Sequence, residues 1–549
     1  MMGNMISGLG ELNPQFLREI KGRLKTRNVL LALFISFLVQ LMLFIYYQAE
    51  LPTKESIYYS LPGYCQGEWI NSEFKCAVDQ YGKVIINWRA WHDDVFSSLS
   101  LIIVFALVLV GVYLLIDDLA RETSRDTLGF IRLAPQSPQS ILVGKILGVP
   151  INLYIAILFA IPWHLWLGLN AQISLEQILI FYGISLVFTI FYYSGALLFG
   201  LIASWLGGVQ SWVGTGLLIA IFLFYKVIDS RNFIPYTLMA LQLIMPQYFI
   251  PNSSGDFSFR NFHWFGISLG NNVAMTISFS LLISIVGTYF LWQSLKRCYS
   301  LCHTTMLSKQ QSYLLTSSFT ILTVGAAGWQ DLTYLNKDNI EILMLMFANF
   351  WLFLYLIAAL TPHRQTIQEW ARYQHVYSHT YPGKHKSIKD LIWGEKSPNI
   401  LAIAINAIIY VIGSSILILA LSEPILYKLN IFLALTFAFT LIIIHAALAQ
   451  LLLLMKNGQR LLWTNVILAA VMIVPVVLLT MLFPDSAHTS LLFSVFAPGL
   501  LIISSETAAI TNAIAIMGHI AIFGLLLWQI KRQLKTLGES GTKALLKSS

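Results

Sequence analysis

Apolar runs of about 20 residues alternate with short polar segments along almost the whole chain. A helix needs about that length to cross the ~30 Å hydrocarbon core of a membrane. The runs predict twelve spans, at about 29–47, 97–116, 141–167, 177–203, 212–228, 271–295, 312–328, 341–360, 400–421, 431–455, 463–483 and 508–529. This pattern predicts an all-α polytopic membrane protein with about 12 transmembrane helices.

A basic amphipathic segment precedes the first span, within residues 1–28. In Asn13–Asn28, the apolar residues Phe16, Ile20 and Leu24 recur every four positions, and basic residues fill the other faces. This spacing predicts a cytoplasmic "elbow" helix that lies in the membrane interface. The alternative is a plain positively charged flank, and the two interpretations are compatible.

The spacing of the spans predicts two unequal halves. Residues 29–300 hold six spans, 301–360 form a helical hairpin of spans 7 and 8, and 400–530 hold spans 9–12. The cytoplasmic linker 361–399 ends in a second basic amphipathic segment, Ser387–Asn399, which leads into span 9. This second elbow suggests a weak internal repeat, and parallel half-repeats are common in transporters.

Composition narrows the function classes. Charged residues make up 11% of the chain and hydrophobic residues 57%, whereas soluble domains carry about 25% charge. No polar stretch is long enough for an independent soluble enzyme domain. The net charge of +8 comes from bases beside span ends, so membrane topology explains it better than nucleic-acid binding.

Lysine and arginine counts set the orientation. With the N-terminus inside, inner segments hold about 24 of them and outer loops about eight, which places both termini in the cytoplasm. The tail 531–549 is then cytoplasmic, and the long outer loops are 48–96 and 229–270. Charged residues run to Arg27 and the apolar run Val29–Tyr47 is long, so we expect a retained first span, not a cleaved signal.

The cysteines suggest one disulfide and no metal site. Cys65 and Cys76 share the first outer loop, where an oxidising compartment favours a disulfide over two free thiols. Cys298, Cys302 and His303 share one helical face, but inert thiols are the favoured interpretation over a metal site. A second weak metal candidate comprises His363, His375, His379 and His385. We therefore predict no metal and no cofactor in this chain.

Motifs for nucleotide binding and catalysis are missing. The Gly-Lys pairs at positions 144 and 383 lack the earlier glycine of a phosphate loop, so any ATP must be bound by a partner. No zinc-protease or nucleophile-elbow motif occurs, which predicts that the chain is not an enzyme. Ionisable residues are scarce in the spans, which argues against an ion-coupled carrier. His164 lies near the outer end of its predicted span, and the deep His445 is interpreted as a packed, hydrogen-bonded residue and not a proton relay. Lys145 is expected to snorkel to lipid headgroups.

The most informative polar stretch is Asp117–Lys145, DDLARETSRDTLGFIRLAPQSPQSILVGK, of which 117–140 separates spans 2 and 3. Its charges are costly in lipid, so it must lie at the aqueous face. It contains, in order, Arg121-Glu122, Thr127-Leu128, Leu133-Ala134-Pro135, Ser137, Ile141-Leu142 and Gly144-Lys145. This order resembles the pattern after the second span of ABC-2 type transporter permeases, which show Arg-Glu, Gly-Thr-Leu-Glu, a Pro-Leu-Ser turn and Gly-Lys. The elbow that starts at Asn13-Pro14 is also similar to theirs, and the resemblance covers roughly residues 13–300.

The resemblance implies the permease subunit of an ABC exporter in the bacterial inner membrane. A separate ATP-binding subunit would hydrolyse ATP, and the cytoplasmic hairpin would be the coupling helix that receives its motion. The residues expected at this contact are Glu122, Arg125, Asp126, Leu128, Phe130, Ile131 and Arg132. For each charged residue, the alternative is a solvated face. An apolar, aromatic cavity would favour an amphipathic or lipid-like substrate.

Two departures from the family pattern leave alternatives open. Gly129-Phe130 stands where the family favours Glu-Leu, and the second half has only Lys456–Leu462 in place of a matching hairpin. Either the halves couple to the ATPase unequally or the chain pairs with a second permease copy; membrane lipids are the other expected partners. Two rival functions remain: a scaffold or assembly factor that does not transport, and a membrane-embedded enzyme that acts on a lipid-linked substrate.

Overall fold

Two compact units make up the chain. The first comprises Met1–Asn232, Gln242–Asn261 and Leu269–Tyr299, and the second comprises Phe233–Leu241, Phe262–Ser268 and Ser300–Ser549. The computed structural model describes residues 13–52, 64–70, 73–133, 135–229, 236–252, 257, 259, 262–300, 304–327, 340–380, 387–420, 425–456, 459–482 and 509–538. The assignment of functional domains to these stretches stays a prediction.

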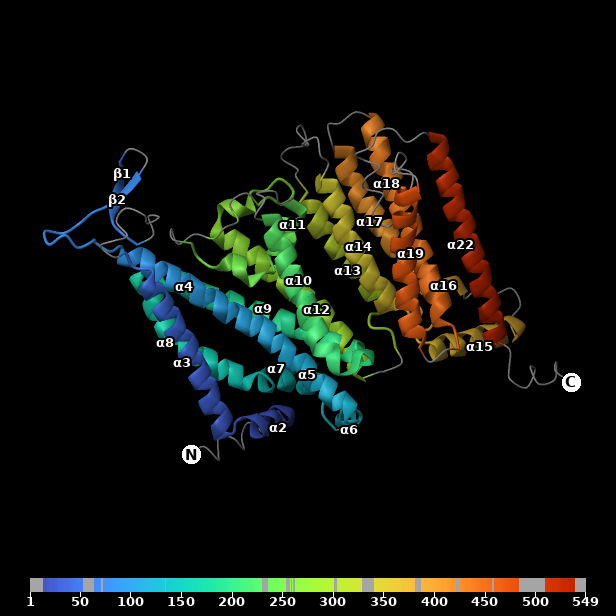
Figure 1. The fold of residues 1–549 in the computed structure, drawn as a ribbon. Coiled ribbons are helices and arrows are strands. Elements are labelled where there is room, and N and C mark those ends of the chain that lie inside the picture. Colours follow the sequence, from blue (N-terminus) through green and yellow to red (C-terminus); the bar gives the residue numbers. More distant parts are fainter. Residues whose placement is uncertain are drawn as a thin grey trace. The chain divides into compact units, whose positions relative to one another are not determined.

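The first unit is a bundle of helices with a small β-hairpin at one end of α4 and the short α6 beyond the far end of α5 (Figure 1). Its elements are α2 (Pro14–Arg23), α3 (Thr26–Ala49), β1 (Gly67–Ile70), β2 (Glu73–Cys76), α4 (Trp88–Phe105), η2 (Ala106–Val110), α5 (Gly111–Ser124), α6 (Thr127–Arg132), α7 (Pro138–Gly148), α8 (Ile151–Asn170), α9 (Leu175–Ile202), η3 (Ser204–Val209), α10 (Gln210–Asp229), η4 (Pro246–Phe249), η5 (Leu269–Asn271) and α12 (Val273–Ser300). Helix α2 packs on α7, and α5 packs between α9 and α10.

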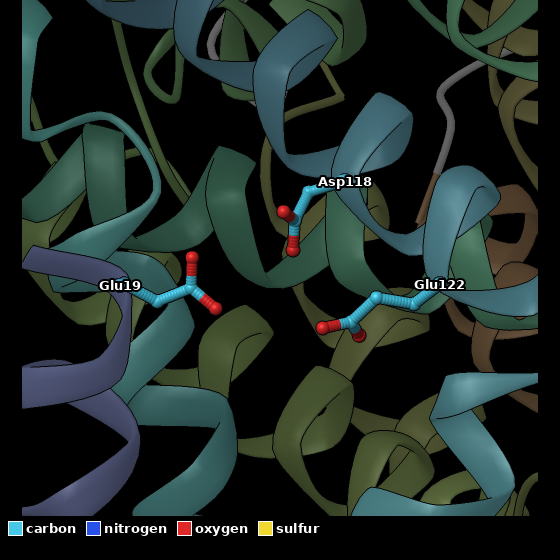
Figure 2. A group of neighbouring side chains, drawn as sticks. All are labelled: Glu19, Asp118 and Glu122. Atoms are coloured by element: carbon cyan, nitrogen blue, oxygen red, sulfur yellow. The ribbon is translucent and has the colours of Figure 1, made fainter. Parts of the chain in front are cut away.

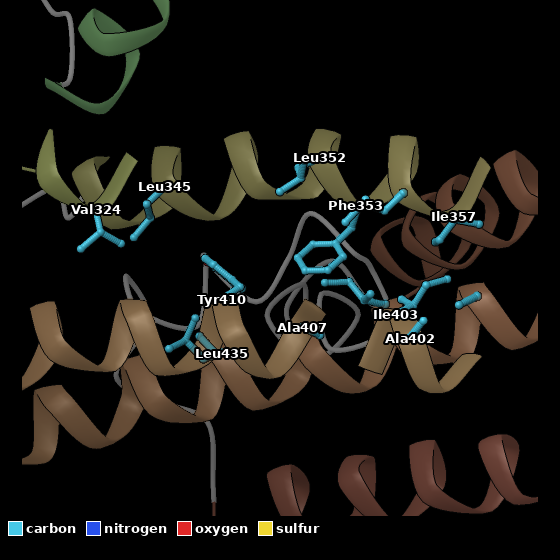
Figure 3. Close-up of a cluster of buried hydrophobic side chains, with 14 of the residues drawn as sticks. Val324, Leu345, Leu352, Phe353, Ile357, Ala402, Ile403, Ala407, Tyr410 and Leu435 are labelled. Carbon is cyan, nitrogen blue, oxygen red and sulfur yellow. The ribbon is translucent and has the colours of Figure 1, made fainter. Parts of the chain in front are cut away.

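In the residues described for it, the second unit is built from helices joined by short non-helical segments, and in its segment Phe262–Ser268 an isolated β-bridge joins Trp264 to Ile267. Its elements are α13 (Lys309–Gly325), α14 (Ile340–Leu360), α15 (Arg364–Thr380), α16 (Ser387–Trp393), α17 (Ile400–Ala420), α18 (Ile425–Leu453), α19 (Arg460–Leu482) and α22 (Ala509–Gly538), with α11 (Tyr236–Gln242) at the unit boundary. Its core is apolar: Figure 3 shows Leu352 and Phe353 of α14 facing Ala407 and Tyr410 of α17.

The all-α polytopic fold class is confirmed. Among the described residues, ten helices are long and apolar enough to cross a membrane: Thr26–Ala49, Trp88–Ser124, Ile151–Asn170, Leu175–Ile202, Ser204–Val227, Val273–Ser300, Ile342–Leu360, Ile400–Ala420, Tyr427–Leu453 and Asn512–Gly538. The other two predicted spans are also helices. However, α13 has 17 residues and the apolar described part of α19 is Leu462–Pro475.

Two spans differ from the prediction. The second is a helical rod of 37 residues that includes the π-helical turn η2, where the Tyr193 hydroxyl donates to the Leu107 carbonyl at 2.8 Å. The prediction of one continuous span at 141–167 was wrong, because the chain breaks between α7 and α8 at Pro150, which has no N–H to continue a helix. Helix α7 is therefore separate from the span α8.

The predicted disulfide between Cys65 and Cys76 is present, with Cα atoms 5.5 Å apart. It closes a β-hairpin that the sequence did not predict, in which Gly67 lies opposite Cys76. The Tyr64 hydroxyl donates to Asp94 Oδ2 at 2.7 Å and so fastens this loop to α4.

Candidate functional site

Helix α2 lies directly on α7 because of one cap and two glycines. Asn13 Oδ1 accepts the Phe16 N–H at 3.0 Å, and Asn13 Nδ2 donates to the Ser140 carbonyl at 2.7 Å. A Cβ on Gly144 would lie 2.9 Å from α2 backbone, and one on Gly148 would overlap an α2 side chain. The two glycines, four residues apart on one face of α7, therefore allow the helices to touch.

Lys145 is buried at the junction of α2, α5 and α7. Its Nζ lies 2.6 Å from Asp118 Oδ2, 2.7 Å from Glu122 Oε2 and 3.8 Å from Glu19 Oε1. The side chain of Lys145 is 0% exposed. Figure 2 shows the three carboxylates converging from α2 and α5. We call these four residues, with Arg18 and Arg23, the ion-pair cluster.

The two arginines of α2 complete the charge balance of the cluster. Arg23 Nε lies 3.2 Å from Glu19 Oε2, and Arg23 Nη2 lies 2.5 Å from Asp118 Oδ1. Arg18 Nη2 lies 3.5 Å from Glu122 Oε1. Three carboxylates thus meet three cations, which is the condition for burying charge at tolerable cost.

The expectation that Lys145 snorkels to lipid headgroups is wrong. Burial by itself lowers the pKa of Lys145, but the carboxylates of Asp118, Glu122 and Glu19 outweigh it and hold the pKa above its usual value. Lys145 is therefore a cation at neutral pH. The three carboxylates are close enough to one another to hold a metal ion, but the ammonium group supplies the cation that they need.

The hairpin continues directly from this cluster. Helix α5 ends at Ser124, and Asp126 adopts a left-handed backbone conformation with φ of 55° before α6 begins. The Thr127 hydroxyl donates to the Glu122 carbonyl at 3.2 Å. Phe130 and Leu133 are 80% and 83% exposed. The short helix α6 therefore follows the C-terminal end of α5 directly and has an exposed apolar face.

The predicted contact residues divide by exposure. Leu128 and Ile131 are buried in the core, so they anchor α6 and are not available to seat a partner. Glu122 is also buried and engaged by Lys145. Four residues remain at least partly accessible: Phe130, Arg125, Asp126 and Arg132, the last with its guanidinium 5.4 Å from the Tyr299 ring. Whether any of them contacts a partner stays a prediction.

Sequence reasoning missed Glu19, Asp118 and Lys145 as one group. Two signals could have pointed to them. Asp118 and Glu122 are spaced i,i+4 on one helix face, and Lys145 stands inside the pattern Gly-Lys-x-x-Gly, which marks a closely packed helix. Neither signal indicates that α2 supplies the third carboxylate, Glu19, to the cluster.

His164 is a buried, packed residue. Its Nε2 lies 2.6 Å from Ser100 Oγ, which also donates to the Phe96 carbonyl at 2.8 Å. Its Nδ1 lies 2.6 Å from the Tyr182 hydroxyl, so both ring nitrogens have hydrogen-bond partners. His445 Nδ1 likewise bonds the Leu441 carbonyl at 2.7 Å.

The weak metal candidates gain no support. Cys298 is half-buried, while Cys302, His303 and His385 lie outside the described residues. The side chains of His375 and His379 are not described either, and His363 is exposed.

No family model, no curated protein and no solved structure matches the chain. The function must therefore be argued from the chain's own residues.

Proposed function

We propose that the chain is the permease subunit of an ABC-2 type exporter in a bacterial inner membrane. It moves an amphipathic or lipid-like substrate outward, with ATP hydrolysed by a separate ATP-binding subunit at the cytoplasmic face. The observation that carries the proposal is the continuity of the exposed α6 face with the ion-pair cluster.

The exposed face of α6 suits a partner. Phe130 and Leu133 lie on a hairpin that the charge pattern predicts to be cytoplasmic. Both side chains are exposed, so their burial in a groove of a partner protein would be favourable. The exposed Arg125 and Asp126 beside them provide polar contacts for the rim of such an interface.

The ion-pair cluster suits transmission of motion. A force on α6 acts on the last turn of α5 through the buried Leu128 and Ile131 and through the Thr127–Glu122 hydrogen bond. From that turn, charge-assisted contacts lead to α7 through Lys145 and to α2, and α2 runs into the first span. Packed and ion-paired helices move as one body, so a push on the hairpin reaches the membrane helices.

A Phe130→Ala substitution tests the proposal. The protein is co-purified with the candidate ATP-binding subunit, and ATPase stimulation is measured. We expect association to weaken about tenfold or more, the effect of removing an aromatic anchor from an interface. Melting temperature should stay unchanged because the side chain is exposed.

Tyr81→Ala is the matched control, because Tyr81 is equally exposed but lies in the first outer loop. If Phe130→Ala leaves both association and ATPase stimulation at the wild-type level, α6 is not the coupling element. A wild-type chain that binds the ATPase without stimulating it would favour the scaffold function.

A further inference from the structure

A pocket of about 420 Å³ opens beside the ion-pair cluster, between α2 and α5. Four arginines line it: Arg18 and Arg23 from α2, and Arg121 and Arg125 from the end of α5. Arg18 and Arg121 have side chains 51% and 68% exposed, so their guanidinium groups face solvent as well as their partners. Arginine forks of this kind match the oxygen geometry of phosphate groups.

Four carboxylates, those of Glu19, Asp117, Asp118 and Glu122, line the pocket together with the four arginines and balance their charge. The buried Lys145 behind this lining adds one positive charge. The cluster itself is neutral, and Asp117 is matched by Arg121, whose Nη2 lies 2.8 Å from Asp117 Oδ2. Arg125 is exposed and has no ion pair with any carboxylate in the described part of the chain. The lining and Lys145 together therefore carry one surplus positive charge, and Arg125 is the exposed cation that can turn toward a ligand.

The residue types along the pocket walls suit the depth of the lipid headgroups. Leu114, which lines it, belongs to the last apolar turns of α5, and the charged residues begin three positions later at Asp117. On the other wall, the amphipathic α2 ends at Arg23 just before the apolar α3. A switch from apolar to charged residues on both walls marks the boundary between acyl chains and water.

We propose that this pocket binds a phosphate group, and specifically the phosphodiester of an anionic phospholipid such as phosphatidylglycerol. One phosphodiester carries one negative charge, which equals the surplus that Arg125 supplies, and Arg18 and Arg121 are placed to share its oxygens. The lipid tails would extend along Leu114 toward the membrane. The inference does not depend on the transport function, because it concerns a site in the membrane chain alone.

The test uses the full chain, purified in detergent and stripped of lipid. Its melting temperature is followed while phosphatidylglycerol, phosphatidylcholine or inorganic phosphate is added, for the wild type, Arg125→Gln and Arg27→Gln. Arg27→Gln removes the same charge from an exposed position outside the pocket. We expect phosphatidylglycerol to stabilise the wild type, Arg125→Gln to weaken this response about tenfold, the size of one charge-assisted hydrogen bond, and Arg27→Gln to leave it unchanged.

The outcomes separate the possibilities. Equal stabilisation by phosphatidylcholine, or equal weakening by both variants, would overturn the site, because the response would then be generic. If inorganic phosphate protects as well as phosphatidylglycerol and Arg125→Gln abolishes both effects, the phosphate site stands and its ligand is free phosphate. An unchanged melting temperature of lipid-free Arg125→Gln shows that the variant is folded.

Discussion

Two short amphipathic helices, α2 and α16, each precede a membrane helix and are each held by a buried lysine, but the two lysines bind different partners. In the first unit, Lys145 of α7 lies 3.8 Å from Glu19 of α2 and also meets the carboxylates of Asp118 and Glu122 of α5. In the second unit, Lys309 of α13 meets neutral oxygens, donating to the Leu391 carbonyl at 2.6 Å, Ser397 Oγ at 2.6 Å and the Pro398 carbonyl at 3.2 Å. On the same face of α13, the Tyr313 hydroxyl donates to the Ile392 carbonyl at 2.8 Å.

The difference assigns the two elbows different tasks. Side chains of α13 hold the second elbow by hydrogen bonds to its backbone carbonyls, so α13 and α16 are rigidly connected. Its neighbourhood has a short α18–α19 turn, to which α15 is bound by the Arg364 Nε donation to the Leu454 carbonyl at 3.0 Å. The first elbow is tied by side-chain charges from three helices beside an exposed hairpin. The proposed coupling function therefore concerns the first elbow, which is ion-paired beside the exposed hairpin.

Lys145→Met should have the largest effect. It leaves the carboxylates of Glu19, Asp118 and Glu122 buried with one cation fewer, and such a loss costs about 3–5 kcal/mol. We expect a large fall in the melting temperature of the purified protein, measured by intrinsic fluorescence.

The double variant Lys145→Met with Glu122→Gln separates charge balance from packing. Because it removes one charge of each sign, it should recover part of the stability lost by Lys145→Met. A double variant that is no more stable than the single one would show that ion pairing does not hold the first elbow.

Gly148→Ala should have the next largest effect, because the added methyl group overlaps Glu19 and pushes α2 from α7. Overpacking of this kind costs about 1–3 kcal/mol. Gly183→Ala on α9 is the matched control, since nothing lies within 4 Å of its Cβ, and the better helix propensity of alanine should make it neutral or stabilising by up to about 1 kcal/mol. Equal melting temperatures for the two variants would contradict close packing of the elbow.

The membrane helices could be predicted from the sequence and the ion-pair cluster could not, for a physical reason. Burial of about 20 apolar residues in lipid is a local property, so hydropathy located most of the spans but misplaced the third, at 141–167. The pairing of Lys145 with Asp118 joins residues 27 positions apart, and that of Arg23 with Asp118 joins residues 95 positions apart. Periodicity within one helix cannot show which other helix supplies the counter-ion. The break between α7 and α8 at Pro150 could have been predicted from the sequence, because proline lacks the N–H that continues the hydrogen bonds of a helix.

The smallest predicted effect is a change of folding stability with pH, to which Lys309 should contribute and Lys145 should not. Burial lowers the pKa of Lys309 to about 8, from 10.5 for an exposed lysine, while the nearby Asp390 opposes the shift. Between these values the unfolded chain binds more protons than the folded one, so the contribution of Lys309 to stability rises with pH. From pH 8 to pH 9, the wild type should gain about 1 kcal/mol relative to Lys309→Met.

Lys145 should contribute no such rise, because its carboxylate partners hold its pKa above the usual value and keep it charged through this window. Chemical unfolding at the two pH values, compared between wild type and Lys309→Met, measures the difference. Parallel pH dependences in the two proteins would mean that Lys309 stays protonated, and that its three neutral oxygens hold an ammonium ion as firmly as the carboxylates hold Lys145. The contrast between a fixed and a charge-dependent elbow would then have to rest on geometry alone.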